Sequence, residues 1–140
     1  MIKQLLLLTI LFLLSNLNLQ AQNIDLNTSI SRGKNVYLKK CAVCHSKDGL
    51  GKGKRIPPLA NSDYLFNNRE ASIRGILFGQ SEKITVNGIV YNRKMKAIKL
   101  SNQEVADVMN YIQNSWGNKN DITVSDSQVQ EVRLKFSKGN

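Results

Sequence analysis

The chain has 140 residues, of which 41% are hydrophobic and 21% are charged, and its formal net charge is +10. That length is enough for one domain with a single core. The positive charge favours acidic partners. Only 6% of the residues are aromatic and none alternate with the basic residues, so a surface that reads nucleic-acid bases is not predicted.

The N-terminus has the three parts of a secretory signal peptide. Lys3 gives a short basic start, residues 5–14 are almost wholly apolar, and Leu19-Gln20-Ala21 is similar to a small-residue cleavage site. The apolar run of about ten residues is shorter than the roughly twenty that a membrane-spanning helix needs. We therefore expect residues 1–21 to be a signal peptide, residues 22–140 to form the exported domain, and the protein to be periplasmic. A retained membrane anchor is the alternative.

Apolar spacing predicts two helices in the first half of the domain. A helix capped by Thr28 or Ser29 is expected to run to about Lys40. Residues 46–63 hold four basic residues, three glycines and two prolines, which favours a loop that other parts of the chain must hold. A second helix is expected over Glu70–Phe78.

The second half begins with a hairpin signal. Residues 84–91 are two short β-branched runs on either side of Asn87-Gly88, which is typical of a two-residue hairpin turn. Ser101 and Glu104 have the spacing of a capping box, so we expect a helix from about Asn102 to Ser115.

A last short helix is expected after an Asn, Lys and Asp linker, with Ser125 as its cap. Its apolar side would carry Val129, Val132 and Phe136. The predicted fold class is therefore all-α with one short β-hairpin. Its core covers about residues 29–117, and residues 118–140 form a C-terminal extension.

The pentapeptide Cys41-Ala42-Val43-Cys44-His45 carries the clearest chemistry in the chain. Cys-x-x-Cys-His is the attachment pattern of a covalent haem, in which two thiols add to the vinyl groups and the histidine binds the iron. A structural zinc site needs four such ligands, and the chain offers three. Little in the chain predicts the parallel sheet of a thioredoxin-like redox pair. A disulfide between Cys41 and Cys44 remains the alternative, and it leaves His45 unexplained.

Two methionines remain after the predicted signal peptide as candidates for the opposite side of the iron. Met109 lies among aliphatic residues at helical spacing, which is typical of a core residue. Met95 lies in a polar, basic loop, where a thioether has no evident packing role. We therefore expect His45 and Met95 to be the axial pair, which would raise the reduction potential and close the iron to other ligands. A five-coordinate iron with an ordinary loop methionine is the alternative.

These motifs resemble the class I mono-haem cytochromes c, in the exported bacterial group that includes domains attached to oxidases and nitrite reductases. The resemblance runs from about Ser31 to Gly117. It implies a cytochrome c fold, with several helices wrapped around one covalent haem c. It also implies that Gly33 and Tyr37 on the first helix cross the helix that contains Tyr111.

The resemblance also assigns roles in the loop after the haem motif. It implies that the carbonyl of Pro57 accepts the ring N–H of the proximal histidine and that Leu59 lies against the haem face. The segment around Met95 departs from the family pattern, because Arg93-Lys94 precede the methionine and Lys96 follows it, where relatives have small residues and proline.

The implied function is single-electron transfer. The expected protein is a monomeric carrier between a quinol-oxidising complex and a terminal oxidase or reductase. The alternatives are a cytochrome subunit bound in a larger redox enzyme and a haem peroxidase or sensor with an open iron site. The roles of Arg69, Arg74 and Trp116 stay open at this stage.

The basic residues are concentrated in the segment that would surround the haem. Between residues 34 and 99 there are 14 Lys or Arg against 4 Asp or Glu. Two basic clusters are expected to flank the haem edge and to attract partners with acidic docking surfaces. They are Lys47, Lys52, Lys54 and Arg55 on one side, and Arg93, Lys94, Lys96 and Lys99 on the other.

Overall fold

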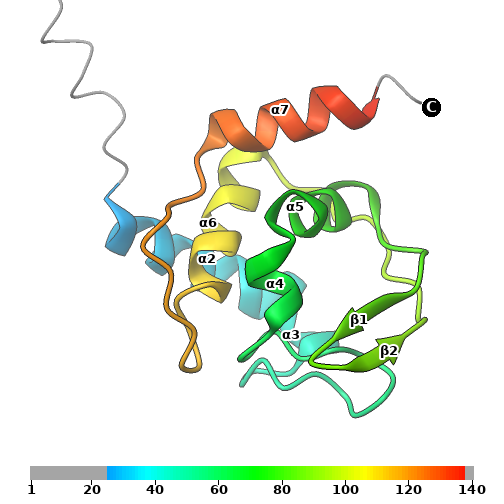
Figure 1. The fold of residues 1–140 in the computed structure, drawn as a ribbon. Coiled ribbons are helices and arrows are strands. Elements are labelled where there is room, and N and C mark those ends of the chain that lie inside the picture. Colours follow the sequence, from blue (N-terminus) through cyan, green and yellow to red (C-terminus); the bar gives the residue numbers. More distant parts are fainter. Residues whose placement is uncertain (1–24, 138–140) are drawn as a thin grey trace, which may run out of the picture.

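The computed structural model describes residues 25–137, and Figure 1 shows its elements. The predicted signal peptide lies outside the described residues. The elements are α2 (Leu26–Lys40), α3 (Ala42–His45), α4 (Asp63–Asn67), α5 (Arg69–Phe78), β1 (Ile84–Val86), β2 (Ile89–Tyr91), α6 (Asn102–Ile112) and α7 (Asp126–Ser137). Within this part of the chain, no helix is both long and apolar enough to cross a bilayer.

Helix α2 begins earlier than predicted, and the expected cap at Thr28 or Ser29 is wrong. Asp25 is the cap, because its carboxylate accepts hydrogen bonds from the amide of Asn27, at 3.1 Å, and from the hydroxyl of Thr28. Ser29 instead lies in the core, where its hydroxyl donates to Asp107 at 2.6 Å. The helix ends as predicted at Lys40.

Helices α2 and α6 cross at very close range, as the resemblance implies. A Cβ atom at Gly33 would overlap the backbone carbonyl of Asp107 and lie 2.8 Å from the Cβ of Tyr111. Asp107 reinforces the crossing, because Arg32 donates to its two carboxylate oxygens at 2.7 and 2.8 Å. This crossing fixes the position at which α2 delivers the chain to Cys41.

A short helix, α4, lies between the predicted loop over residues 46–63 and α5. The sequence prediction missed it. Ser62 caps it by accepting from the amide of Leu65 at 3.3 Å, and Leu65 is buried beneath it. Helix α5 then follows within one residue of its predicted range, and Gly79 ends it with a φ of 88°.

The hairpin has the predicted two-residue turn. Val86 pairs with Ile89, and the turn residues Asn87 and Gly88 have φ values of 50° and 76°, as a type I′ turn requires. Asn87 also exchanges two hydrogen bonds with Asp63, at 2.7 and 3.0 Å, so the start of α4 holds the turn in place.

Helix α6 opens with the predicted capping box, but it ends at Ile112 rather than Ser115. The carbonyl of Ile112 accepts instead from the side-chain amide of Asn118, at 2.7 Å, and a series of turns follows. Ser125 caps α7 as predicted, since its hydroxyl accepts from the amide of Gln128 at 3.2 Å.

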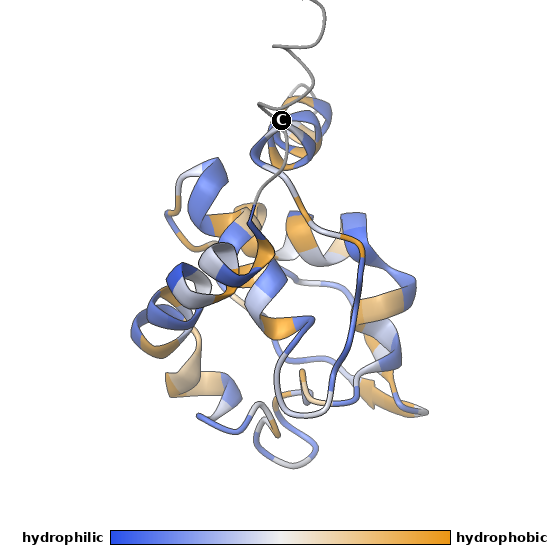
Figure 2. Ribbon diagram, turned by 90° about the vertical axis from the view of Figure 1, so that its left-hand side faces the viewer, coloured by the Kyte–Doolittle hydropathy of each residue, from blue (hydrophilic) through white to orange (hydrophobic). Residues whose placement is uncertain are grey.

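The helices surround one core, and in Figure 2 each carries both hydrophobic and hydrophilic residues. Helix α7 lies across α5 and α6 in Figure 1, and it buries Val129 and Val132. The buried core residues include Tyr37, Leu65, Ile73, Val105, Val108, Met109 and Ile112.

Candidate functional site

The Cys-x-x-Cys-His segment forms a single helical turn, α3, directly after α2. The amides of Cys44 and His45 both bond to the carbonyl of Cys41, at 3.0 and 2.9 Å. The turn therefore brings the two thiols and the imidazole close together. Both cysteines are free thiols, Cys41 half-buried and Cys44 exposed. Burial, with a smaller contribution from Cys44, raises the pKa of Cys41 to about 11, so this thiol is neutral near pH 7.

The imidazole of His45 is held by the carbonyl of Pro57, with 3.1 Å between Nδ1 and the oxygen. A carbonyl can only accept, so Nδ1 carries the hydrogen and Nε2 is left with a free lone pair. Burial holds the pKa of His45 below its usual range, although the bond to Pro57 acts in the opposite direction. At neutral pH the ring is therefore neutral, which is the form that binds metals.

The loop over residues 46–62 is held to the rest of the domain by α6 and the turns after it. The indole N–H of Trp116 donates to the carbonyl of Lys47 at 3.1 Å, and the indole ring packs against Gly49. The side chain of Asn118 bonds both to the carbonyl of Leu59, at 2.8 Å, and to the amide of Asn61, at 2.7 Å. Trp116 thus packs at the end of α6 and on this loop.

Met95 is positioned by a backbone pair with Gln80. The amide of each residue donates to the carbonyl of the other, at 2.8 and 2.9 Å. Gly79 lies so close to the Met95 carbonyl that a Cβ atom there would approach it to 2.7 Å. The backbone of Met95 is therefore tied to the residues that follow α5. The side chain of Met95 is half-buried, in contrast to its exposed neighbours Lys94 and Lys96.

The candidate site residues meet at one cavity with two adjoining lobes. The outer lobe has a volume of about 380 Å³ and the inner lobe about 110 Å³. Cofactor pockets commonly fall in the range of roughly 300–1,000 Å³. Six residues line both lobes: Cys41, His45, Pro57, Gln80, Ile84 and Met95.

The two lobes differ in polarity. The inner lobe is mostly apolar and is bounded by Leu59, Gly75, Ile76, Val108, Met109 and Ile112, among others. The outer lobe carries basic residues, which are Lys40, Arg55, Arg93, Lys94 and Lys96. A flat molecule with an apolar body and one accessible edge suits this combination. Leu59 lines the apolar inner lobe, and its contact with a haem face stays a prediction.

Sequence reasoning missed several residues that build the site. Gln80 lines both lobes and pairs with Met95, but no motif marks it. Asn118 follows Trp116-Gly117 shortly after α6, and nothing in its spacing marks its role. The bonds between Asp63 and Asn87 join residues 24 positions apart, so sequence periodicity gives no sign of them.

Comparison with known proteins agrees with this geometry. The family model described as Cytochrome c matches residues 30–116. This chain belongs to the cytochrome c family. As a member, it carries a covalent haem c, and the predicted fold class is confirmed.

Relatives fall into two groups. The chain is 34% identical to cytochrome c-552 of Thermus thermophilus over 112 residues, which is 74% of this chain and 85% of that protein. It is 35% identical to the cytochrome c subunit of a quinone alcohol dehydrogenase from Gluconobacter oxydans over 103 residues, 72% of this chain and 22% of the relative. A gluconate 2-dehydrogenase cytochrome c subunit from Pantoea cypripedii is 32% identical over 72% of this chain. The chain spans less than a quarter of the length of these dehydrogenase subunits.

The residues around the cavity of this cytochrome domain fit haem c. Two free thiols, one neutral imidazole and the thioether of Met95 all line the outer lobe, and the thioether of Met109 lines the inner lobe alone. Thiols can add to the vinyl groups of a haem, imidazole and thioether are donors suited to its iron, and the apolar inner lobe suits a porphyrin face.

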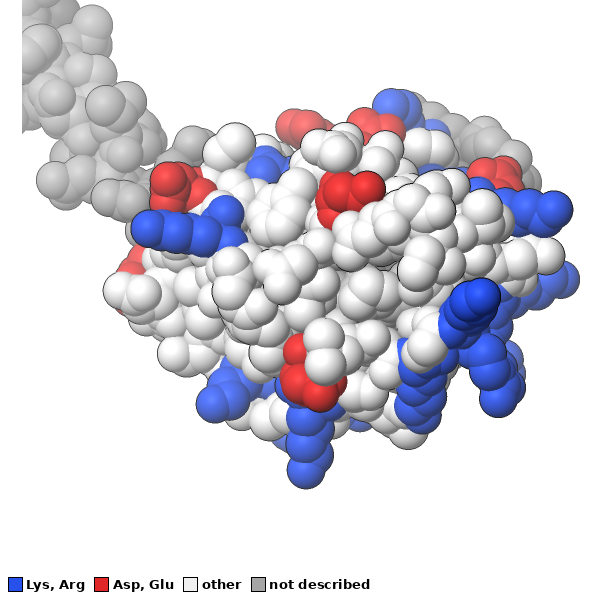
Figure 3. Space-filling model, turned by 60° about the horizontal axis from the view of Figure 1, so that its bottom comes forward, with Lys and Arg blue, Asp and Glu red and all other residues white. Residues whose placement is uncertain are grey.

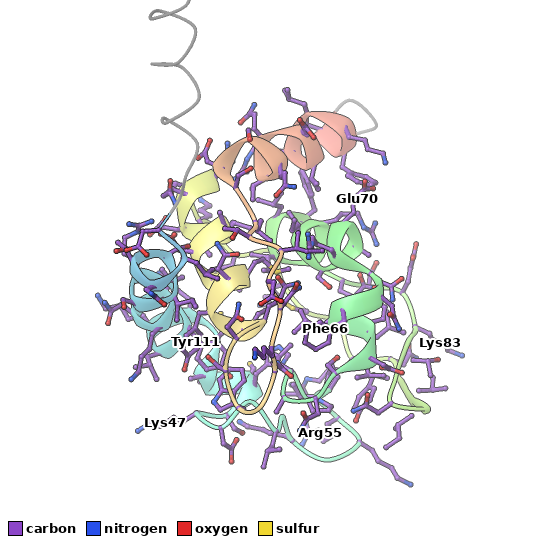
Figure 4. The ribbon with its side chains drawn as sticks, turned by 60° about the vertical axis from the view of Figure 1, so that its left-hand side comes forward. Lys47, Arg55, Phe66, Glu70, Lys83 and Tyr111 are labelled. Atoms are coloured by element: carbon purple, nitrogen blue, oxygen red, sulfur yellow. The ribbon has the colours of Figure 1, made fainter. Side chains whose placement is uncertain are left out.

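The charged surface near the cavity is strongly basic. Figure 3 brings the lower face of the domain forward, and in the lower half of that view Lys and Arg outnumber Asp and Glu, which lie mostly toward the top. Lys47 and Arg55 extend from the loop at the lower end of the molecule in Figure 4. Arg55 and Arg93 also line a small cleft of about 170 Å³ together with Cys44 and Lys52, so the two basic clusters meet beside the second cysteine.

Arg69 and Arg74 both belong to α5. Arg69 is half-buried at the first position of the helix, and Arg74 makes contacts with other segments. The guanidinium of Arg74 donates to Gln80 at 3.4 Å and lies 5.6 Å from the centre of the Phe136 ring.

Proposed function

We propose that this chain is a periplasmic single-electron carrier in which Cys41 and Cys44 attach haem c and His45 and Met95 bind the iron from opposite sides. The observation that carries the proposal is that His45 and Met95 line the same two-lobed cavity as Cys41. Residues 1–21 act as the signal peptide, and residues 22–140 form the exported domain.

The residues around the cavity divide the work of such a carrier. When bound, haem c supplies an iron centre that gains or loses one electron. Pro57 fixes the tautomer and orientation of His45 by accepting from Nδ1. The thioether of Met95 favours the reduced state, because a soft ligand prefers ferrous iron. The apolar side chains of Leu59, Ile76 and Val108 exclude water, which disfavours the more positive oxidised state.

Two methionine variants test the axial assignment. Spectra of the oxidised protein should contain a methionine-to-iron charge-transfer band, and a pyridine haemochrome should show covalent haem. We expect Met95→Leu to lose the band and to bind carbon monoxide rapidly when reduced. Met109→Leu is the matched control, because Met109 is a fully buried core residue of α6 that also lines the inner lobe.

Absence of the methionine band would point to a haem peroxidase or sensor instead of an electron carrier. If the unmodified protein lacks the band and binds carbon monoxide rapidly, Met95 is not a ligand and an open-site peroxidase or sensor is favoured. If Met109→Leu rather than Met95→Leu abolishes the band, the axial ligand lies on α6.

The partners that suit this surface are redox proteins with acidic docking sites, such as a quinol-oxidising complex and a terminal oxidase or reductase. The basic cleft lined by Arg55 and Arg93 supports this proposal, because basic residues beside the second cysteine would steer an acidic surface toward the cofactor. We expect the rate of electron transfer to fall steeply as ionic strength rises, and more weakly in an Arg55→Gln, Arg93→Gln variant. A flat salt profile for the unmodified protein would exclude steering.

A permanently bound subunit of a dehydrogenase is the second candidate function. The relatives named as cytochrome c subunits of quinone alcohol dehydrogenase and gluconate 2-dehydrogenase favour it. The similarity to the short cytochrome c-552, of which 85% is covered, favours the independent carrier. Sizing of the native protein separates the two, since a carrier runs as a monomer and a subunit co-purifies with its enzyme. N-terminal sequencing of the exported protein tests cleavage after Ala21.

A further inference from the structure

Helix α7 lies beyond residues 30–116, the part that matches the family model. It packs on α5 and α6 and buries Val129 and Val132, which explains why it docks on the domain. Its polar and aromatic contacts, however, are directed to the segments on both sides of Met95. We call residues 92–100 the Met95 loop.

The first contact holds the end of the Met95 loop. The guanidinium of Arg133 donates from Nη2 to the carbonyl of Leu100 at 3.0 Å and from Nε to the side-chain oxygen of Asn102 at 2.8 Å. Gln130 reaches the side chain of the same asparagine. The planar guanidinium therefore ties α7 to the junction between the Met95 loop and α6.

The second contact reaches the backbone of Met95 through α5. The ring of Phe136 lies 5.6 Å from the guanidinium carbon of Arg74, a cation–π distance. Arg74 donates to Gln80 at 3.4 Å, and Gln80 is paired with the backbone of Met95 in both directions. Glu82 lies 3.9 Å from Arg74 on the solvent side.

A further ion pair fastens the same end of α7. Lys135 lies 2.7 Å from Glu70 at the start of α5, and Figure 4 shows Glu70 beneath α7. Both partners are more than half exposed, so this pair contributes little on its own. The apolar and guanidinium contacts are therefore the ones that fix the position of α7.

We propose that α7 is a positioning element for Met95, which holds the end of the Met95 loop directly and the backbone of Met95 through α5, so that the thioether stays at the cavity. This inference rests on the proposed role of Met95 as the axial ligand. The basic, proline-free sequence around Met95 gives the loop little rigidity of its own. Rigidity is supplied instead by α7, through Arg133 on one side and through Phe136, Arg74 and Gln80 on the other.

Two conservative substitutions in α7 test the proposal in the haem-containing protein. Arg133→Met keeps the aliphatic stem but removes the donors, and Phe136→Leu keeps apolar volume but removes the ring face. Leu134→Ala is the control, because Leu134 lies on the same helix and is 50% exposed. The measured quantity is the apparent affinity of imidazole for the oxidised protein, followed by loss of the methionine charge-transfer band, together with the reduction potential.

A looser Met95 loop is easier for imidazole to displace. We expect imidazole to bind about threefold more tightly to Phe136→Leu, from loss of the cation–π contact, and about tenfold more tightly to Arg133→Met, from loss of charge-assisted bonds. The reduction potential should fall in both. Hydrogen exchange of the Met95 amide should also become faster, and this readout does not depend on the iron. Helix content and haem attachment, measured on each variant, confirm that it has folded.

Gln80→Ala is a second test of the proposal, and it leaves the sequence of α7 unchanged. It should weaken Met95 ligation to a similar degree, and adding Phe136→Leu should then have no further effect, because the path is already cut. If the effects of Gln80→Ala and Phe136→Leu on imidazole affinity are fully additive, the path from Phe136 through Arg74 and Gln80 to Met95 is wrong. Unchanged imidazole affinity, potential and Met95 exchange in both α7 variants would overturn the whole inference. If the unmodified protein lacks the methionine band, it is the proposed axial role of Met95 that fails, and the inference falls with it.

Discussion

Replacing Gly33 with alanine tests the close crossing of α2 and α6 directly. The added Cβ would overlap the backbone carbonyl of Asp107, which cannot move without shifting α6, and would lie 2.8 Å from the Cβ of Tyr111. Overpacking of this kind costs about 3 kcal/mol. Alanine is favoured over glycine in a helix by about 1 kcal/mol, so a net loss of about 2 kcal/mol is expected.

Thermal and denaturant unfolding of the haem-containing protein, followed by far-UV circular dichroism, measures this loss. A decrease of about 2 kcal/mol corresponds to a fall in Tm of about 8 °C for a domain of this size. Asn35→Ala is the matched control, because Asn35 is exposed on the same helix and its replacement should gain about 0.5 kcal/mol from helix propensity. If Gly33→Ala is as stable as Asn35→Ala, the two helices do not approach as closely as described.

Two further predictions concern α6 and the turns after it. The pKa of Glu104 is lowered, mainly by the backbone N–H of Ser101, which donates to it at 2.8 Å. Since the folded state binds that proton less readily, the stabilisation is present above pH 4.5 and lost as the pH falls, so the advantage of the unmodified protein over Glu104→Gln in denaturant unfolding should shrink in acid. Asn118→Ala leaves the buried carbonyl of Ile112 and the half-buried carbonyl of Leu59 without their partner, and should cost about 3 kcal/mol in the same assay. A loss below about 1 kcal/mol would show that water replaces these bonds.

Local patterns explain why most of the fold could be predicted. The hairpin turn at Asn87-Gly88, the capping box at Ser101 and the cap of the last helix at Ser125 each depend on residues within four positions of one another. The first cap was misplaced because Asp25, Thr28 and Ser29 lie within five residues of one another and are all good caps, and tertiary contacts decide between them. Helix α4 was missed because five residues are too few for a periodic pattern.

The candidate site shows the same division. Cys41, Cys44 and His45 could be found because their spacing is itself the motif, and the cofactor prediction is confirmed by membership of the family. The assignment of Met95 to the iron stays a prediction. The partners that hold Met95 in place, Gln80 and Arg133, could not be found, since each acts through a contact that only the folded chain creates.

The side chain of Asn118 bonds at once to the loop before α4 and to the last carbonyl of α6. Because α6 also crosses α2, we expect the loop before α4, α6 and α2 to unfold together as one cooperative unit. Their amides should have the highest protection from hydrogen exchange. The hairpin and the Met95 loop have fewer buried apolar contacts and should open earlier. Such an order would let the methionine side of the cavity open and close while the segment that carries both cysteines and His45 stays folded.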